Sequence, residues 1–484
     1  VFQIESRAQM SMLPRLKPQT YEDLVIEVAI VRPGPIQGGM VHPYLKQRER
    51  VRKGLPILYE KEELKPALER TLGIPIFQEQ VMQIAMIAAK FSADEADQLR
   101  RAMAAWKRKG GLDKFHAKLV DGMVDNKYPK EFAEAIFKQI LGFGDYGFPE
   151  SHAASFALLV TISSWLKNYE PACFLAALLD SQPMGFYSPS QLVQDARRHG
   201  VEVRAVDVTC SEIDTTLEAR TPDAPRMPPG TDTRYAERLG NENQPAVRLG
   251  LNRVLSLSEA GARRLLAARA QAPFTSTEDL ALRAELEGKD MAALAAADAL
   301  MSLSGHRRQQ VWDATAQHRS SALLKGVPIH EQALLLPAAP EGEEIVGDYA
   351  ALGLTLRRHP LALLRPRLAR MRLLSAVELR AARSGQTVRA CGIVKGRQRP
   401  GTANGTIFVT LEDETGNVNV IVWSHVIEAW REPLLKSHLL AVQGTWQRDD
   451  DSGGKVQHLI ATGFKDLTPL LGRLAQSNTS RDFH

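Results

Sequence analysis

The chain has 484 residues, a hydrophobic fraction of 44% and a formal net charge of +5. This length predicts about three domains, and the composition is ordinary for globular proteins with real cores. The charge is only a mild indication of polyanionic partners, because it is spread over a long chain. The three cysteines form no CxxC pair, which argues against a disulfide framework or structural zinc and favours a reducing cytoplasm. No apolar stretch approaches the ~20 residues of a membrane span, so we expect no membrane contact.

The chain begins at Val1 rather than at a methionine. We therefore expect it to be a piece of a longer protein. Helical patterns are densest from residue 1 to about 180, with helices predicted over residues 74–90, 92–108, 130–141 and 152–169. The second helix should start at a capping box, serine followed three residues later by glutamate. The fourth is apolar nearly all round, so we expect it to be buried. The predicted apolar face of the first helix consists of Val81, Ile84, Ala85 and Ala88.

The second half of the chain changes character three times. A proline-marked linker precedes alanine-rich helices at residues 246–320, and residues 337–348 form another polar connector. From residue 385 to about 466 the pattern switches to short β-type runs separated by glycines. Four or five such strands in so short a segment predict a small closed barrel. The predicted strands are residues 388–394, 406–412, 417–423 and 439–445.

The most basic helical stretch is residues 99–109. Arg100 with Lys107, and Arg101 with Arg108, are each seven residues apart, so each pair shares a helix face. Guanidinium groups make bidentate hydrogen bonds to phosphate oxygens, which points to a triphosphate or a nucleic-acid backbone. A solvated basic face is the alternative.

A glycine-rich loop at residues 142–147 leads into Ser151 and His152 at the start of the fourth predicted helix. Glycines permit close backbone approach to a ligand, and a helix N-terminus favours an anion. A turn with a capping serine and a packed histidine is the alternative. The loop at residues 31–40 has Arg32 at its base and is a structural corner by default.

Residues 357–383 contain eight arginines opposed only by Glu378. Such one-sided charge suits phosphate contact, although a charge run is usually a solvated surface. The sequence contains no GxxxxGK[ST] phosphate loop, no GxSxG motif and no HExxH motif.

Several motifs taken in order resemble the bacterial C-family DNA polymerases, the polymerase III alpha subunits and their relatives. They are residues 1–7 (VFQIESR), 32–35 (RPGP), 77–82 (FQEQVM), 99–103 (LRRAM), and Tyr-Gly-Phe at 146–148 with Ser-His at 151–152. The runs at residues 32–44, 149–150, 181–191 and 480–484 resemble the error-prone branch of that family.

The resemblance implies a multidomain fold: mostly α-helical fingers and a helix-hairpin-helix region, followed by a small all-β OB-fold barrel. The implied domains are residues 1–180 as fingers, 181–245 as a connector with a Pro-rich linker, 246–320 as the helix-hairpin-helix region, 321–384 as a linker and basic segment, 385–470 as the OB-fold, and 471–484 as a polar tail.

The resemblance also implies site residues. Those expected at the incoming nucleotide are Arg100, Arg101, Tyr146, Gly147, Ser151 and His152. Those expected at DNA are Arg32, Lys107, Arg108, Lys109, Arg253, Arg397, Phe408, Trp423 and Trp446, with the aromatic residues having core packing as their alternative. The family's two Mg²⁺ ions are bound by three palm aspartates. These would lie upstream of Val1, so we expect no catalytic or metal-binding residue in this chain.

The expected function is template-directed DNA synthesis by an error-prone, translesion DNA polymerase, a nucleotidyltransferase. The expected partners are primer–template DNA, deoxynucleoside triphosphates, and a sliding clamp or accessory translesion proteins. This chain alone should bind primed DNA without extending it. The alternatives are a non-catalytic nucleic-acid-binding scaffold and a replicative polymerase III alpha subunit. One departure from the family is the hairpin at residues 252–260, which lacks glycine and leaves open whether it grips duplex.

Overall fold

The structure is a computed structural model that forms two compact units, unit 1 and unit 2. Unit 1 comprises Val1–Trp165, Gly401–Asn404 and Arg448–Val456, and unit 2 comprises Leu166–Pro400, Gly405–Gln447 and Gln457–His484. The described residues are 1–32, 35–36, 38–109, 113–143, 149–184, 187–222, 244–316, 334–401, 403, 405–477 and 481–483.

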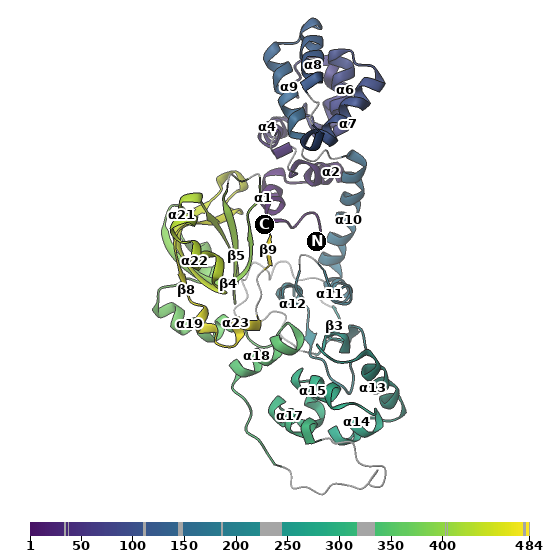
Figure 1. Cartoon of the computed structure of the whole chain (residues 1–484), viewed down its shortest axis with the longest axis vertical. Coiled ribbons are helices and arrows are strands. Elements are labelled where there is room, and N and C mark those ends of the chain that lie inside the picture. The colour runs from purple at the N-terminus through teal and green to yellow at the C-terminus, as the bar shows by residue number, and fades with distance from the viewer. Residues whose placement is uncertain are drawn as a thin grey trace. The chain divides into compact units, whose positions relative to one another are not determined.

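Unit 1 is helical, and its main core lies in the bundle of α6 to α9 (Figure 1). The apolar face predicted for the first of these helices is confirmed, because its four residues are all at most 2% exposed. The helices of unit 1 are α1 (Arg7–Leu16), α2 (Tyr21–Ile30), α4 (Val41–Arg52), α5 (Lys65–Leu68) between the 3-10 turns η1 (Glu62–Leu64) and η2 (Glu69–Thr71), α6 (Gln78–Ala89), α7 (Ala93–Lys109), α8 (Asp113–Asp125), α9 (Lys130–Phe143) and most of α10 (Glu150–Tyr169).

Helix α7 begins where the sequence predicted. The backbone N–H of Ser92 donates to Glu95 Oε2 over 3.0 Å, and the N–H of Glu95 donates to Ser92 Oγ over 3.3 Å. This reciprocal pair is the predicted capping box, which satisfies two amides that have no partner within the helix.

Helix α10 corrects one prediction. Its buried face consists of the small residues Ala153, Ala157 and Val160, whereas Leu159 is 57% exposed and Ile162 is 51% exposed. Helix α10 therefore has apolar side chains on faces that remain exposed in this structure, and the prediction that the whole helix is buried is wrong. In the described residues, neither α10 nor any other helix has the length and hydropathy to cross a membrane.

The first part of unit 2 packs helices around a small sheet. The sheet has the order β1-β3-β2, with β1 and β3 parallel and β2 antiparallel to β3. Strands of two or three residues are too short to give a periodic sequence signal, which is why they were not predicted. The elements are α11 (Pro171–Asp180), α12 (Pro189–Arg198), β1 (Val203–Arg204), β2 (Thr216–Glu218), β3 (Ala246–Arg248), η4 (Leu251–Arg253), α13 (Glu259–Gln271), α14 (Thr277–Arg283), α15 (Gly288–Ala296), α16 (Met301–Ser304) and α17 (Arg307–Ala316).

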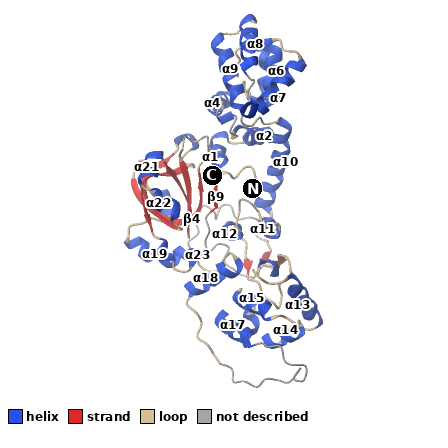
Figure 2. Cartoon of the chain, viewed as in Figure 1, coloured by secondary structure: helices blue, strands red, loops and turns tan. Residues whose placement is uncertain are grey.

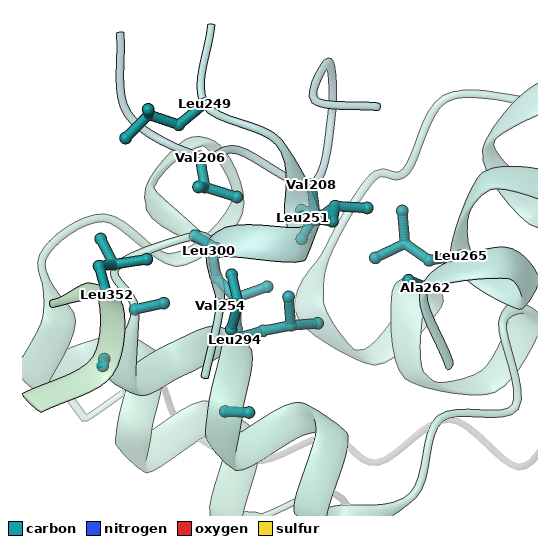
Figure 3. Close-up of a cluster of buried hydrophobic side chains, with 14 of the residues drawn as sticks. Val206, Val208, Leu249, Leu251, Val254, Ala262, Leu265, Leu294, Leu300 and Leu352 are labelled. Atoms are coloured by element: carbon teal, nitrogen blue, oxygen red, sulfur yellow. The ribbon is translucent and has the colours of Figure 1, made fainter. Parts of the chain in front are cut away.

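The core of this part gathers side chains from loops, the sheet region and several helices. Figure 3 shows Val206, Leu251, Leu265 and Leu300, which come from separate segments of the chain and belong to one apolar cluster. Leu352, which is later in the chain on α18 (Glu341–Leu352), also reaches this cluster.

Helix α18 packs on both sides. Its Ile345 and Tyr349 belong to a second apolar cluster that contains Cys391 and Ile393 of the barrel. The same helix thus contributes to the helical core and to the barrel's packing within unit 2. It is followed by α19 (Pro360–Arg370) and α20 (Ala376–Ala381).

The predicted closed barrel is confirmed, with five main strands in the order β4-β5-β6-β8-β7 and closure by pairing of β4 with β7. The strands stand out in red in Figure 2 among mostly helical elements. The strands that follow residue 448 were not among the predicted runs. The two helices that follow β6 were not predicted either. The elements are β4 (Thr387–Gln398), β5 (Ile407–Asp413), β6 (Gly416–Val422), α21 (Ser424–Ala429), α22 (Arg431–Lys436), β7 (Leu439–Arg448), η6 (Asp450–Ser452), β8 (Gln457–Asp466), η7 (Thr468–Leu471), α23 (Leu474–Ser477) and β9 (Arg481–Phe483), which pairs parallel to the end of β4.

Candidate nucleotide and nucleic-acid interface

Helix α7 presents its two predicted phosphate-binding arginines on the side away from the core. Leu99 and Met103 are fully buried, whereas the side chains of Arg100 and Arg101 are 41% and 75% exposed. The side chains of Lys107, Arg108 and Lys109 lie outside the described residues, so their role stays a prediction.

Both arginines share one carboxylate that the sequence analysis did not single out. Arg100 Nη2 lies 2.8 Å from Asp97 Oδ1, and Arg101 Nε lies 2.7 Å from Asp97 Oδ2. The hydrogen bond from Arg100 holds the pKa of Asp97 below its ordinary value. The signal was present in the sequence, because residues three and four apart face each other on a helix. Two guanidinium groups on one carboxylate leave a net positive site with donors to spare.

The start of α10 holds Ser151 and His152, both exposed, as the sequence placed them. The ring of His152 contacts Phe156, with ring centroids 4.6 Å apart. Tyr146 and Gly147 of the preceding loop lie outside the described residues.

The N-terminus of α10 already receives an anion from within the chain. The backbone N–H of Glu150 donates to the carboxylate of Glu79 on α6, over 3.1 Å to Oε2. Arg70 pairs with Glu150 and, over 2.8 Å, with Glu22. Because a carboxylate fills part of the expected anion position, a triphosphate there would have to share or displace it.

Arg32, a predicted DNA contact, is hydrogen-bonded within unit 1. Its Nε donates to the backbone oxygen of Val28 over 3.2 Å, and its Nη2 donates to the side chain of Gln3. Arg32 therefore holds the first residues of the chain against α2, which supports the structural-corner interpretation without testing DNA contact.

Helix α2 also contains an acid with no bonding partner among the described residues. Glu27 is fully buried, and neither of its carboxylate oxygens has a hydrogen-bond partner. Burial raises the pKa of Glu27 to about 8, so the protonated form is favoured at neutral pH.

The glycine-poor hairpin of unit 2 keeps a left-handed turn without glycine. Ser256 has φ of 69° there, a conformation that glycine adopts at lower cost. The amide of Leu255 donates to the backbone oxygen of Ala351 over 2.9 Å, and that of Ser258 donates to Asp290 Oδ1 over 2.9 Å. Two amides that a phosphate could use are thus bonded internally, which favours a packing role for this hairpin.

Arg253 is the second residue of that hairpin segment and is half-buried. Its Nε donates to the side-chain oxygen of Asn252 over 3.1 Å. Burial lowers the pKa of the Arg253 guanidinium from its ordinary value. A DNA contact by Arg253 stays a prediction.

The barrel separates the four predicted contacts into two kinds. Trp423 at the end of β6 is 47% exposed, and Phe408 on β5 is half-buried. Trp446 is 3% exposed in the barrel core, and Arg397 is 6% exposed. Trp446 and Arg397 are therefore corrected to structural residues in this fold.

The burial of Arg397 has a local cause. The pairing of β4 with β5 shifts register between Val394 and Gly396, and such a bulge changes which side chains point inward. The guanidinium of Arg397 donates to the backbone oxygens of Leu434 and Ser437, over 2.6 Å each. The sequence analysis also missed Trp430, which follows α21 and is 41% exposed.

Part of the arginine-rich segment is paired with acids from elsewhere in unit 2. Arg357 contacts Asp298 over 2.8 Å and Asp348 over 2.9 Å, while Arg365 pairs with Glu414. Arg307 joins Asp348 from the other side. The predicted one-sided charge is thus corrected for these positions.

The described carboxylates do not fit the two Mg²⁺ ions that the family resemblance implies. Asp298, Glu344 and Asp348 gather in unit 2, but their oxygens are bonded to guanidinium groups. No group of three or more metal-binding side chains occurs in the described part of the chain.

Three family matches follow the same order as these sites. Residues 1–127 match the bacterial DNA polymerase III alpha subunit finger domain, residues 200–310 match the helix-hairpin-helix motif, and residues 388–467 match the OB-fold nucleic acid binding domain.

Curated relatives match the entire chain. It is 58% identical to an error-prone DNA polymerase of Ralstonia nicotianae, 53% identical to one of Alkalilimnicola ehrlichii and 54% identical to one of Methylococcus capsulatus. All of this chain is covered in each case, but only 43%, 44% and 45% of the respective relatives. The chain therefore spans less than half the length of these relatives. A solved asparaginyl-tRNA synthetase from Pyrococcus horikoshii covers 17% of this chain and 20% of its own, with 23% identity and a TM-score of 0.15.

Proposed function

From the premise that this chain belongs to the bacterial C-family DNA polymerases and matches error-prone members over its full length, we propose that it holds DNA and nucleotide during error-prone, translesion DNA synthesis. Unit 1 would contact the incoming deoxynucleoside triphosphate through Arg100 and Arg101. The barrel would bind single-stranded template on its β5–β6 face, the face that OB-folds use for oligonucleotides.

The observation that carries this proposal is the pair of arginines on α7. Two exposed guanidinium groups share the single carboxylate of Asp97, so most of their N–H donors have no partner among the described residues. Phosphate oxygens match such donors in charge and geometry. The finger-domain match covers this helix.

The exposed ring of Trp423 supports the proposal that the barrel binds single-stranded template. Rings that stack on bases need an accessible face, and Trp423 is 47% exposed while the buried Trp446 is not available. Phe408 lies on the outer side of β5, directly opposite Ile421 of β6.

We propose further that catalysis needs metal-binding carboxylates from outside this chain. Two-metal phosphoryl transfer uses Mg²⁺ to activate the attacking hydroxyl and neutralise the phosphates. Positive residues such as Arg101 can orient the triphosphate but cannot replace those ligands. A sliding clamp or accessory translesion proteins would be further partners of the whole polymerase.

Two measurements on the purified chain test the proposal. Fluorescence anisotropy should detect binding of primed DNA, with affinity that falls steeply as salt rises. A primer-extension assay with Mg²⁺ should show no incorporation. Primer extension by this chain would contradict the proposal that the catalytic carboxylates come from outside it. Absence of DNA binding would contradict the proposed function itself.

A pair of tryptophan variants locates the single-strand contact. Trp423→Ala should weaken oligothymidylate binding by about 1–3 kcal/mol with an unchanged melting temperature. Trp446→Ala should lower the melting temperature because it empties part of the barrel core. Equal binding by Trp423→Ala and the parent chain would remove the β5–β6 face from the proposal.

A further inference from the structure

A surface with two exposed arginines lies on the barrel where β4 pairs with β7, rather than where β5 pairs with β6. It is a groove of about 290 Å³ between the end of α19, the first residues of β4 and the middle of β7, and we call it the β4–β7 groove. Its polar lining consists of Arg372, Gln386, Thr387, Arg389 and Gln443.

The pleat of β4 builds the floor of this groove. Thr387 and Arg389 are exposed, while Val388 and Ala390 between and beside them are buried, as expected for alternating residues of a strand. Gln443 of β7 lies directly opposite Arg389 in the antiparallel pairing.

The other wall is fixed to β4 by a backbone bond. The N–H of Leu374 donates to the backbone oxygen of Arg389 over 2.8 Å. Arg372 therefore lies two residues from a point that is bonded to β4. The two arginines approach the groove from adjacent backbone segments.

The two arginines differ from their neighbours in having no partner. Within the described residues, neither guanidinium forms a hydrogen bond or an ion pair, although Arg357 and Arg365 are paired with buried acids. Both Arg372 and Arg389 are exposed, and no acidic residue lines the groove.

The backbone at Arg372 gives a second, independent indication. Arg372 follows α19 with φ of 57°, the left-handed position that glycine commonly occupies at a helix end. Its N–H donates to the backbone oxygen of Ala369, and that of Leu373 donates to Leu368. A side chain at this position costs free energy that glycine would avoid, so backbone geometry does not account for an arginine there.

We propose that the β4–β7 groove binds phosphate groups of a single-stranded DNA backbone and so extends the barrel's contact with template beyond the β5–β6 face. The ligand is a backbone rather than a base because the lining contains guanidinium, amide and hydroxyl groups but no aromatic ring. This inference rests on the proposed function, since it assumes that the barrel binds single-stranded DNA.

The test compares the double variant Arg372→Gly with Arg389→Gln against the single variant Arg367→Gln in the full chain. Arg367 is also exposed and without a described partner, but it lies outside the groove. Because glycine suits the left-handed position, Arg372→Gly should fold with an unchanged or higher melting temperature.

Binding of labelled oligothymidylate is measured by anisotropy at several salt concentrations. The double variant should bind about tenfold more weakly at low salt, and its log–log salt slope should fall by about 1.4, since each single-strand phosphate contact contributes about 0.7. Arg367→Gln should change the slope by less than half as much. Equal slopes for the double variant and Arg367→Gln would overturn the groove assignment.

Two further arms separate the possible failures. If the parent chain does not bind the oligonucleotide at all, the proposed function fails together with the inference. If Trp423→Ala weakens binding while the groove variants bind like the parent, only the groove assignment fails. If pyrophosphate binding depends on Arg372 and Arg389 but oligonucleotide binding does not, the groove takes free phosphate and the backbone assignment is wrong.

Discussion

Arg357 in unit 2 and Arg101 in unit 1 are the same residue type in opposite surroundings. Arg357 is surrounded by Asp298, Glu344 and Asp348, which come from segments up to 59 residues away in the chain. Arg101 is 75% exposed and shares one carboxylate from its own helix. The first charge is neutralised within the fold, and the second is available to a ligand. A run of basic residues in a sequence therefore indicates a binding surface only where the fold supplies no acidic partners for them.

The largest expected effect belongs to the buried side of this comparison. Asp348→Ala would remove one of the three buried acids that Arg307 and Arg357 share, and would leave Asp298 and Glu344 to balance both guanidinium groups. Breaking a buried pair in this way should destabilise unit 2 by about 3–5 kcal/mol. Urea unfolding of the chain measures the loss. Glu341→Ala is the matched control, because it removes the partner of Arg358, which is 64% exposed, and should cost under ~1 kcal/mol. Equal losses would show that burial does not separate the two kinds of pair.

Glu27 extends the comparison to a buried acid that has no partner among the described residues, because its protonation makes the stability of the fold depend on pH. The pKa of Glu27 rises from 4.5 to about 8 on burial, so the folded chain keeps a proton that the unfolded chain loses in that interval. Stability should therefore fall as pH rises from about 4.5 to about 8, by about 2–4 kcal/mol. Glu27→Gln cannot ionise and should be more stable than the parent at pH 8, with little difference near pH 4.5.

Denaturant unfolding at both pH values tests this expectation. Glu49→Gln serves as the control, because Glu49 is exposed and its ion-pair partner among the described residues is Lys53, at the C-terminal end of α4. Parallel pH profiles for Glu27→Gln and the parent would mean that Glu27 acquires a partner or water in solution.

On the exposed side, Arg101→Ala should affect a ligand rather than the fold. In a polymerase that contains this chain, the variant should raise the nucleotide KM or lower the extension rate by about ten- to a hundredfold, the value of one charge-assisted hydrogen bond. Arg101→Lys should recover only part of the activity, since lysine lacks the bidentate geometry. Steady-state kinetics at varied nucleotide and at varied DNA provide the measurement. Normal nucleotide dependence in both Arg100→Ala and Arg101→Ala would leave α7 a solvated face.

The smallest effect concerns the acid between them. Asp97→Ala removes two helical ion pairs, those with Arg100 and Arg101, and should cost about 0.4–1 kcal/mol of stability. Because the carboxylate competes with phosphate for the same donors, the nucleotide KM should stay level or fall slightly. A rise in KM as large as that of Arg101→Ala would instead make Asp97 a positioning residue for the arginines.

Local signals explain what could be predicted from the sequence. The capping box at Ser92 and Glu95 and the alternation in β4 to β7 depend on neighbours in the chain, and both were found. Arg397 and Trp446 were misjudged because a bulge in β4 and closure of the barrel decide which side chains face inward. Of the acids around Arg357, Asp298 lies 59 residues away in the chain, and Glu344 and Asp348 lie 13 and 9 residues away. None of the three is within one helical turn, so no local periodicity pairs them with Arg357. Asp97, by contrast, was within one helical turn and could have been found.

Helix α10 shows a second limit of sequence patterns. An apolar stretch of sequence predicts that a helix face is buried, but it does not identify the element or partner that buries it. In this chain Ala153 and Ala157 are covered, while Leu159 and Ile162 are not.

Helix α18 has a consequence for how such proteins can be recombined. Its Ile345 and Tyr349 are shared with the barrel, and Leu352 is shared with the helical core one or two turns later. A chimaera joined at Thr387, the first residue of β4, would combine the barrel of one relative with the α18 of another. The apolar contacts between them would then not match. Exchange of the barrel between relatives should therefore succeed only when the segment from Glu341 onward is inherited with it, so the heritable module is larger than the five strands that define the fold.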